Sequence, residues 1–285
     1  MITASITPDE YESFREFLED ASGIVLGDNK HYLITSRITR LMAELSISSF
    51  AELLEKMKED HRLRRRIMDA MTTNETSWFR DTYPYDFLKD KFFPECKNEK
   101  GDPIRIWSAA CSTGQEPYSI SVTAHEFLLR HPGLIPTDSI QVWGTDISSN
   151  ALKRARAGVY DDVALSRGMS EDMRKRYFKQ EGNQWRVSDD VKKRVNFQEL
   201  NLKTGFASLG KFDVIFCRNV LIYFAPNLKS EIMGRLAQNL KPNGYLILGG
   251  SETISGYSEE FEMLRWKSVG VVYQLKDKKN NRQVG

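Results

Sequence analysis

The chain has 285 residues, which is enough for about two domains. Its composition of 40% hydrophobic and 28% charged residues is typical of a globular protein. The 41 Lys and Arg nearly balance the 39 Asp and Glu, which argues against a nucleic-acid partner. Cys96, Cys111 and Cys217 form no C-x-x-C pair, so we expect neither a disulfide framework nor a metal site. Because the sequence contains no secretory signal and no apolar run of about 18 residues, we expect no membrane insertion and a cytoplasmic location.

Residues 1–72 predict a small N-terminal all-helical domain. A capped amphipathic helix is expected over ITPDEYESFREFLEDASG, where Thr7 and Glu10 have the spacing of a capping box. The recurrence of apolar residues predicts three more helices, near 30–45, 49–57 and 61–71.

Charge is distributed unevenly over this domain. Residues 1–29 have a balance of −6, whereas residues 30–42 have +3 and residues 56–68 have +4. Such runs are usually solvated helix faces, but the two basic segments could also form a docking surface for an acidic partner.

From residue 101 to the end, short β-rich runs alternate with helical stretches. This alternation predicts a doubly wound, mostly parallel α/β sheet, whose ligands bind beyond the carboxyl ends of the strands. Residues 73–100 are interpreted as a linker between the domains, and residues 160–195 as an inserted antiparallel β subdomain with a Gly-Asn turn. Strands are expected at 104–109, 140–145, 195–198, 213–217, 245–249 and 269–274, and helices at 117–130, 150–157 and 228–240.

The turn after the first strand, ACSTGQEP, has a single glycine. We expect Gly114 to let a ligand approach the backbone, but the absence of G-x-G-x-x-G makes a dinucleotide an unfavourable ligand. Glu116 could pair with the ammonium group of a ligand, or it could simply be an acid in the first turn of a helix.

Polar residues also follow the later strands. Asp146 could accept hydrogen bonds from both hydroxyls of a ribose, or it could cap the next helix. Asn201 and Leu202 suit the edge and the face of an adenine, and the heads of Arg218 and Asn219 need partners. Together these positions favour a nucleoside with a charged amino-acid end, and S-adenosylmethionine is the common ligand of that kind.

The motifs MTTNETSWFRDTYPYDFL, IWSAACSTGQEPYSI, GTDIS, FCRNVLIYF and GGSE strongly resemble the CheR family of chemotaxis-receptor glutamate methyltransferases. The resemblance covers almost the whole chain. It implies a class I methyltransferase-like fold and the conversion of S-adenosylmethionine to S-adenosylhomocysteine. It also implies that the methyl group is transferred to receptor glutamates, forming γ-methyl esters in sensory adaptation.

The resemblance assigns residues to this cofactor. Glu116 should hold the methionine ammonium and Asp146 the ribose. Arg80 should orient the acceptor carboxylate or hold the cofactor carboxylate, and Tyr223 is expected to line the acceptor channel. Without the resemblance, Asn74 and Thr76 would be helix caps and Arg80 a surface ion pair. The full set of cofactor positions that it implies is Asn74, Thr76, Arg80, Glu116, Asp146, Asn201, Leu202, Arg218 and Asn219.

The implied partner is the cytoplasmic domain of a methyl-accepting chemotaxis receptor. Its Glu-rich helices suit the basic segments 30–42 and 56–68, whereas the short hairpin FKQEGNQWRV argues against the capture of a receptor C-terminal peptide. Nothing in the sequence demands more than a monomer.

Three other functions fit the sequence less well. A methyltransferase for RNA or a small metabolite lacks support because CRNVLIYF stands where an Asn/Asp-Pro-Pro-Tyr motif would be. A non-catalytic adaptor conflicts with the intact cofactor positions, and an NAD-linked oxidoreductase conflicts with the missing glycines.

Overall fold

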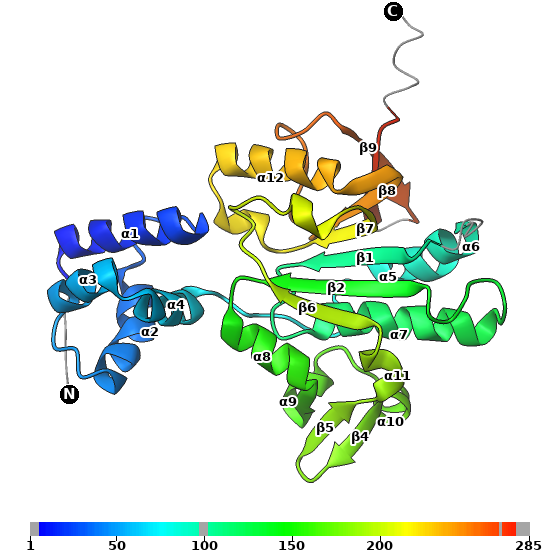
Figure 1. Ribbon diagram of the computed structural model, residues 1–285, viewed down its shortest axis with the longest axis horizontal. Helices are drawn as coiled ribbons and strands as arrows, with labels where there is room; N and C mark the ends of the chain where they lie inside the picture. The colour runs from blue at the N-terminus through cyan, green and yellow to red at the C-terminus, as the bar shows by residue number, and fades with distance from the viewer. Residues whose placement is uncertain (1–5, 97–101, 268–269, 278–285) are drawn as a thin grey trace, which may run out of the picture.

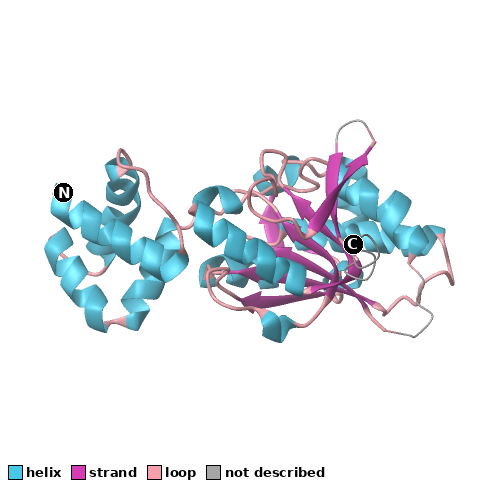
Figure 2. Cartoon of the chain, turned by 90° about the horizontal axis from the view of Figure 1, so that it is seen from above, coloured by secondary structure: helices cyan, strands magenta, loops and turns pink. Residues whose placement is uncertain are grey.

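The protein has a helical lobe and a larger sheet lobe, joined by a thin connection (Figures 1 and 2). This computed structural model describes residues 6–96, 102–267 and 270–277. Within those residues, no helix is both long and apolar enough to cross a membrane.

The helical lobe consists of α1 (Pro8–Ser22), α2 (His31–Glu44), α3 (Phe50–Glu59) and α4 (His61–Met71), so the four expected helices are confirmed. The predicted capping box is present, because the Thr7 side chain accepts the Glu10 amide and Glu10 accepts the Thr7 amide in return. The apolar faces of the four helices form one buried core, which includes Phe14, Ile38 and Phe50.

The sheet lobe contains seven strands in the order β6-β2-β1-β7-β8-β10-β9. β6, β2, β1, β7 and β8 are parallel, and β10 runs antiparallel to both β8 and β9. The mostly parallel sheet is therefore confirmed, whereas β9 was not predicted, and Val269 of the last expected strand lies outside the described residues. The bounds are β1 Ile104–Ala109, β2 Ile140–Asp146, β6 Val195–Glu199, β7 Phe212–Cys217, β8 Leu240–Leu248, β9 Phe261–Trp266 and β10 Gly270–Leu275.

Helices cover both faces of this sheet. α7 (Gln115–Arg130) contacts β2, β1 and β6, α8 (Ser149–Ala157) contacts β6 and β2, and α12 (Pro226–Gln238) packs with β8. Side chains alternate along the strands, so that Ile106 and Phe216 pack toward α7 while Trp107 and Ile215 pack toward α12. The strand order reverses between β1 and β7, where a ligand site is expected in such sheets.

Residues 83–95 differ from the expected linker. They form a continuous helical stretch of α5 (Tyr83–Phe87), the π-helix η1 (Leu88–Phe92) and α6 (Phe93–Glu95). Its aromatic side chains enter the same core as α7 and the sheet, so this stretch belongs to the sheet lobe. Among the described residues, only those between α4 and α5 cross from one lobe to the other.

The insertion is a small antiparallel sheet in the order β3-β5-β4, beside helices α9, α10 and α11. The predicted antiparallel pair and its two-residue turn are confirmed, and Gly182 has the positive φ of 61° that this turn needs. The bounds are β3 Val159–Asp161, α9 Asp162–Ser166, α10 Glu171–Tyr177, β4 Phe178–Glu181, β5 Gln184–Val187 and α11 Asp189–Lys192, and two 3₁₀ turns follow, η2 Ala207–Leu209 and η3 Leu221–Tyr223.

Candidate cofactor and acceptor site

A pocket lies between the lobes, over the carboxyl ends of the parallel strands. Its walls come from the α1–α2 loop, the connection that follows α4, and the segments after β1, β2, β6 and β7. The structure brings all ten predicted site residues to this one pocket: Asn74, Thr76, Arg80, Glu116, Asp146, Asn201, Leu202, Arg218, Asn219 and Tyr223.

The connection between the lobes is pinned to the sheet lobe. The Ser112 hydroxyl donates to the Asn74 carbonyl oxygen at 3.0 Å, and the Trp78 amide donates to the Arg167 carbonyl at 2.9 Å. The Trp78 ring is buried and makes edge contacts with aromatic rings of the insertion. Neither Asn74 nor Thr76 precedes a helix directly, so their interpretation as helix caps is wrong.

The backbone around Arg80 is unusual. Phe79, Asp81 and Thr82 have φ values of 47°, 66° and 44°, a region that non-glycine residues rarely occupy. The Phe79 amide donates to the Ser119 hydroxyl at 3.1 Å, and the Arg80 carbonyl accepts from Arg218 at 2.9 Å. The chain thus turns sharply here and presents Arg80 to the pocket.

A charge cluster around the buried Arg218 side chain forms the floor of the pocket near β1 and β7. The Arg218 guanidinium contacts Glu116 at 2.9 Å and Asp81 at 2.6 Å, and the Ser108 hydroxyl donates to Glu116 at 2.8 Å. Burial lowers the pKa of Arg218, but the neighbouring Glu116, Tyr85 and Asp81 raise it more, so that the net pKa is above the usual value. Arg218 is therefore a permanent cation. The sequence predicts that its head needs partners, and Glu116 and Asp81 are those partners.

Asp146 ends β2 and is buried. Its two carboxylate oxygens accept the Ser112 and Ser148 amides, each at 2.8 Å, which leaves further lone pairs for a ligand. Burial raises the pKa of Asp146, against the lowering effect of those amides. The alternative role as the cap of α8 is wrong, because Ser148 caps that helix by accepting the Ala151 amide.

Gly114 has a different role from the one expected. Its φ of 96° favours glycine, and an added Cβ would lie 2.9 Å from the Cβ of Ala155 and 3.1 Å from the Tyr160 hydroxyl. The residue is therefore needed for close packing of the turn against α8, and it is not among the residues that line the pocket.

Asn201 and Leu202 come just after β6. The Asn201 amide nitrogen donates to the Ala21 carbonyl of α1 at 2.8 Å, and its oxygen accepts the Lys203 amide at 2.9 Å. The side-chain head of Asn201 thus joins the two lobes, while Leu202 is buried at the pocket wall. The adenine role of this pair stays a prediction.

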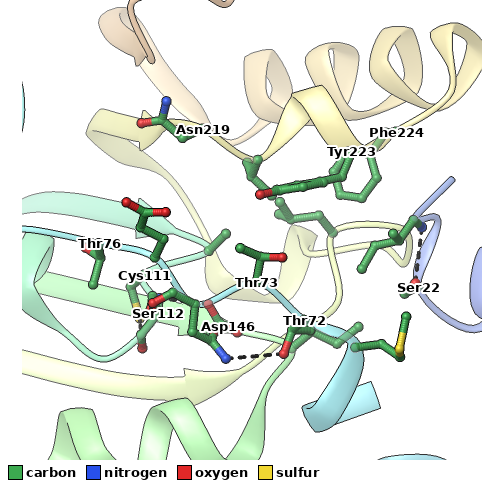
Figure 3. A pocket seen from close by; sticks show the side chains of 18 of the residues that line it. Ser22, Thr72, Thr73, Thr76, Cys111, Ser112, Asp146, Asn219, Tyr223 and Phe224 are labelled. Atoms are coloured by element: carbon green, nitrogen blue, oxygen red, sulfur yellow. Dashed lines mark hydrogen bonds between the residues drawn. The ribbon is translucent and has the colours of Figure 1, made fainter. Parts of the chain in front are cut away.

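The segment after β7 forms the wall opposite Asp146. Figure 3 shows Tyr223 reaching toward the centre of the cavity, with Asp146 and Ser112 on the other side. The Val25 amide donates to the Tyr223 carbonyl at 2.9 Å, and Ile24 forms a β-bridge with Phe224. The α1–α2 loop of the helical lobe is therefore paired directly with the segment that carries Tyr223.

Sequence reasoning missed three residues that organise the site. Asp81 pairs with Arg218, Ser112 joins the connection to Asp146, and Glu252 accepts four backbone amides around the segment after β7. The residue types gave no signal for Asp81 and Ser112, since their partners are far away along the chain. Glu252 belongs to the GGSE motif, which is part of the family resemblance but indicates no function for this residue.

The donor set fits a nucleoside with a charged amino-acid end. The pocket contains the acids Glu116 and Asp146, the cation Arg80 and the apolar side chains of Ile147 and Leu202. The buried Nε of Arg218 has no hydrogen-bond partner within the described part of the chain. Fold and site together define the class of S-adenosylmethionine-dependent methyltransferases.

Comparisons with known proteins agree. Residues 74–269 match the sequence model described as CheR methyltransferase, SAM binding domain, and residues 9–72 match the CheR methyltransferase, all-alpha domain. The chain is 48% identical to the chemotaxis protein methyltransferase of Vibrio parahaemolyticus and 47% identical to chemotaxis protein methyltransferase 1 of Vibrio cholerae, with 97% of this chain and 100% of each relative covered. It is also 46% identical to chemotaxis protein methyltransferase 1 of Pseudomonas aeruginosa, over 94% of this chain and 98% of the relative. The chain belongs to the CheR methyltransferase family.

Proposed function

We propose that this protein methylates specific glutamate side chains in the cytoplasmic helices of chemotaxis receptors and forms γ-methyl esters during sensory adaptation. The observation that carries the proposal is the pocket that brings Glu116, Asp146, Arg218 and Tyr223 together in a chain of this family. The relatives' names, chemotaxis protein methyltransferase, support the receptor as the class of substrate.

Each cofactor contact rests on the chemistry of one side chain. Glu116 would hold the ammonium of S-adenosylmethionine, and Asp146 would accept hydrogen bonds from its ribose hydroxyls. Asn201 and Leu202 would meet the edge and the face of the adenine, with Ile147 beside them. Asn74 and Thr76 would contact the cofactor from the connection between the lobes. When bound, the cofactor supplies a methyl group on a positively charged sulfur.

The acceptor side of the site needs no general base. A glutamate carboxylate has an ordinary pKa of about 4.3 and is already ionised at neutral pH. Arg80 would orient this carboxylate or hold the carboxylate of the cofactor, and Tyr223 would line the channel through which the glutamate enters. Positioning of this kind is worth about 7–11 kcal/mol in favourable cases.

The basic faces of α2 and α4 are proposed as the receptor-docking surface. Arg37, Arg40 and Arg66 line a second groove beside the start of α8. Arg37 also donates to the Met71 carbonyl at 2.7 Å, and Arg64 bonds the carbonyl oxygens that end α3, so these two residues have structural roles. Arg40 and Arg62 are the better candidates for contact with an acidic helix, because both side chains are exposed.

Three further assignments complete the proposal. We propose a monomer that works in the cytoplasm, where the acceptor helices lie. We also propose that the chain divides into a helical domain at 1–72 and a methyltransferase domain at 101–285, with a cofactor-contacting connection that starts at residue 73 and the helical stretch 83–95 packed on the methyltransferase domain.

The direct test is a methyl-transfer assay with radiolabelled S-adenosylmethionine and receptor cytoplasmic fragments. We expect label in the receptor that is released by base as volatile methanol, which identifies an ester. Fragments with the acceptor glutamates changed to alanine serve as the control. Base-stable label, or no label in the presence of bound cofactor, would overturn the proposal.

A further inference from the structure

Glu252 lies in the turn after β8 and accepts four backbone amides. Its carboxylate binds the amides of Asn219, Val220 and Leu221 at 2.7, 3.0 and 2.8 Å, and that of Gly249 at 2.9 Å. The first three amides are consecutive and belong to the segment after β7. One side chain therefore ties the ends of two neighbouring parallel strands together.

The three consecutive amides form a concave site for an anion. Asn219 has a φ of 58°, and a residue in this left-handed region within a turn lets successive N–H groups point to one place. Such sites often bind phosphate or carboxylate ligands, but here the protein's own Glu252 fills the concavity. Hydrogen bonds to a carboxylate are roughly twice as strong as those between neutral groups, so the charge of Glu252 strengthens its hold on the backbone of residues 219–221.

The segment held by Glu252 is a wall of the pocket. Asn219, Val220 and Tyr223 line the cavity, whereas Glu252 does not. Tyr223 follows the anchored amides by two residues, and its carbonyl accepts the Val25 amide of the helical lobe. A shift of the anchored turn would thus move Tyr223 and its pairing with the α1–α2 loop together.

The ends of β7 and β8 are closely packed around Gly249. A Cβ added at Gly249 would lie 2.8 Å from the side-chain Nδ2 of Asn219 and 2.8 Å from the Glu252 carboxylate. The Asn219 side chain therefore lies close to Gly249, while Glu252 binds the Asn219 backbone amide. The backbone amide of Asn219 is bound by a carboxylate that comes from the turn after the neighbouring strand, β8.

We propose that Glu252 is a positioning residue for methyl transfer. Its carboxylate sets the backbone of residues 219–221, and through it the placement of Asn219 and Tyr223, while it touches neither cofactor nor acceptor. The inference rests on the proposed methyl transfer, and it adds a residue outside the pocket on which the rate depends.

The test compares Glu252→Gln and Glu252→Asp with Glu262→Gln, an exposed control on β9. Glutamine has one acceptor oxygen and turns an N–H₂ group toward amides that also donate, so we expect kcat to fall about tenfold or more. Cofactor affinity, measured by calorimetry, should change less than kcat. Aspartate keeps the charge, and we expect it to restore part of the loss, while the control keeps the wild-type rate.

Hydrogen exchange supplies the second readout. In Glu252→Gln, the amides of residues 219–221 should exchange faster, while the strands of the sheet keep their protection. Faster exchange with an unchanged kcat would overturn the inference and leave only a structural role. If the glutamine variant does not fold, the aspartate variant decides by the same two measurements. A wild-type protein without activity would instead refute the proposed function itself.

Discussion

The buried pair of Arg218 and Glu116 allows a quantitative test. Their side chains are 1% and 13% exposed, and Nη1 lies 2.9 Å from Oε2. Arg218→Met leaves a buried carboxylate without its cation, and such a loss typically costs about 3–5 kcal/mol. Glu116→Gln is milder, about 1.5–3 kcal/mol for a hydrogen bond to a charged group, because Arg218 keeps Asp81 at 2.6 Å.

The double variant Arg218→Met with Glu116→Gln isolates the interaction energy of the pair from the other contacts of each residue. With both charges removed, neither partner is left unpaired, so the double variant should be more stable than the sum of the single losses by about 1–3 kcal/mol. Urea unfolding followed by tryptophan fluorescence is the suitable assay. All five tryptophans lie at residue 78 or later, so the signal reports on the sheet lobe and on the connection that packs against it.

A matched cycle on an exposed pair calibrates the result. Lys91 and Glu95 are 2.8 Å apart on one helix turn and partly exposed, and such pairs contribute about 0.3–0.5 kcal/mol. If the cycle for Arg218 and Glu116 were additive to within about 0.5 kcal/mol, the reasoning from burial would be refuted.

Two further predictions concern the cofactor and the receptor. Because burial raises the pKa of Asp146, this carboxyl gains its proton at a higher pH than an ordinary aspartate, and its contribution to the stability of the native state grows as pH falls. S-adenosylhomocysteine should bind more weakly as pH falls, because the protonated carboxyl is a poorer acceptor for the ribose hydroxyls. Calorimetry across pH should find this weakening of binding absent in Asp146→Asn. The double variant Arg40→Glu with Arg62→Glu should raise the KM for receptor fragments about tenfold and leave the cofactor affinity unchanged. The control Arg130→Glu, at the far end of α7, should leave the KM unchanged. An unchanged KM in the double variant would exclude this docking surface.

Local signals explain the parts of the fold that were predicted. The capping box of Thr7 and Glu10 involves residues three apart, and the four helices of the first lobe follow from apolar spacing alone. The parallel strands were predicted because each is a short apolar run between turns. The gathering of Glu116, Asp146, Asn201, Leu202, Arg218 and Asn219 followed from one rule, that the carboxyl ends of parallel strands meet at the same edge. Asn74, Thr76, Arg80 and Tyr223 were predicted from the family resemblance alone.

Long-range contacts explain the rest. Residues 83–95 contain two prolines and many aromatics, a pattern with no clear helical period, and they fold as a helix because the sheet offers an apolar face. Arg64 was counted in a docking surface, but its guanidinium binds the Met57 and Lys58 carbonyl oxygens. No sequence pattern identifies such partners, because a charged side chain is the same residue type whether it binds a neighbour or a receptor.

The strained turn around Arg80 connects these observations. Residues in sparsely populated backbone regions cost about 1–3 kcal/mol each and persist only when surrounding contacts hold them. Here the Trp78 ring is buried on one side of Arg80, and Asp81 pairs with Arg218 on the other. Both contacts come from the chain itself, so the fold holds the backbone at Arg80 and directs this residue to the pocket. The ordering cost is then met by folding, which leaves more of the binding energy for holding the two reactants together.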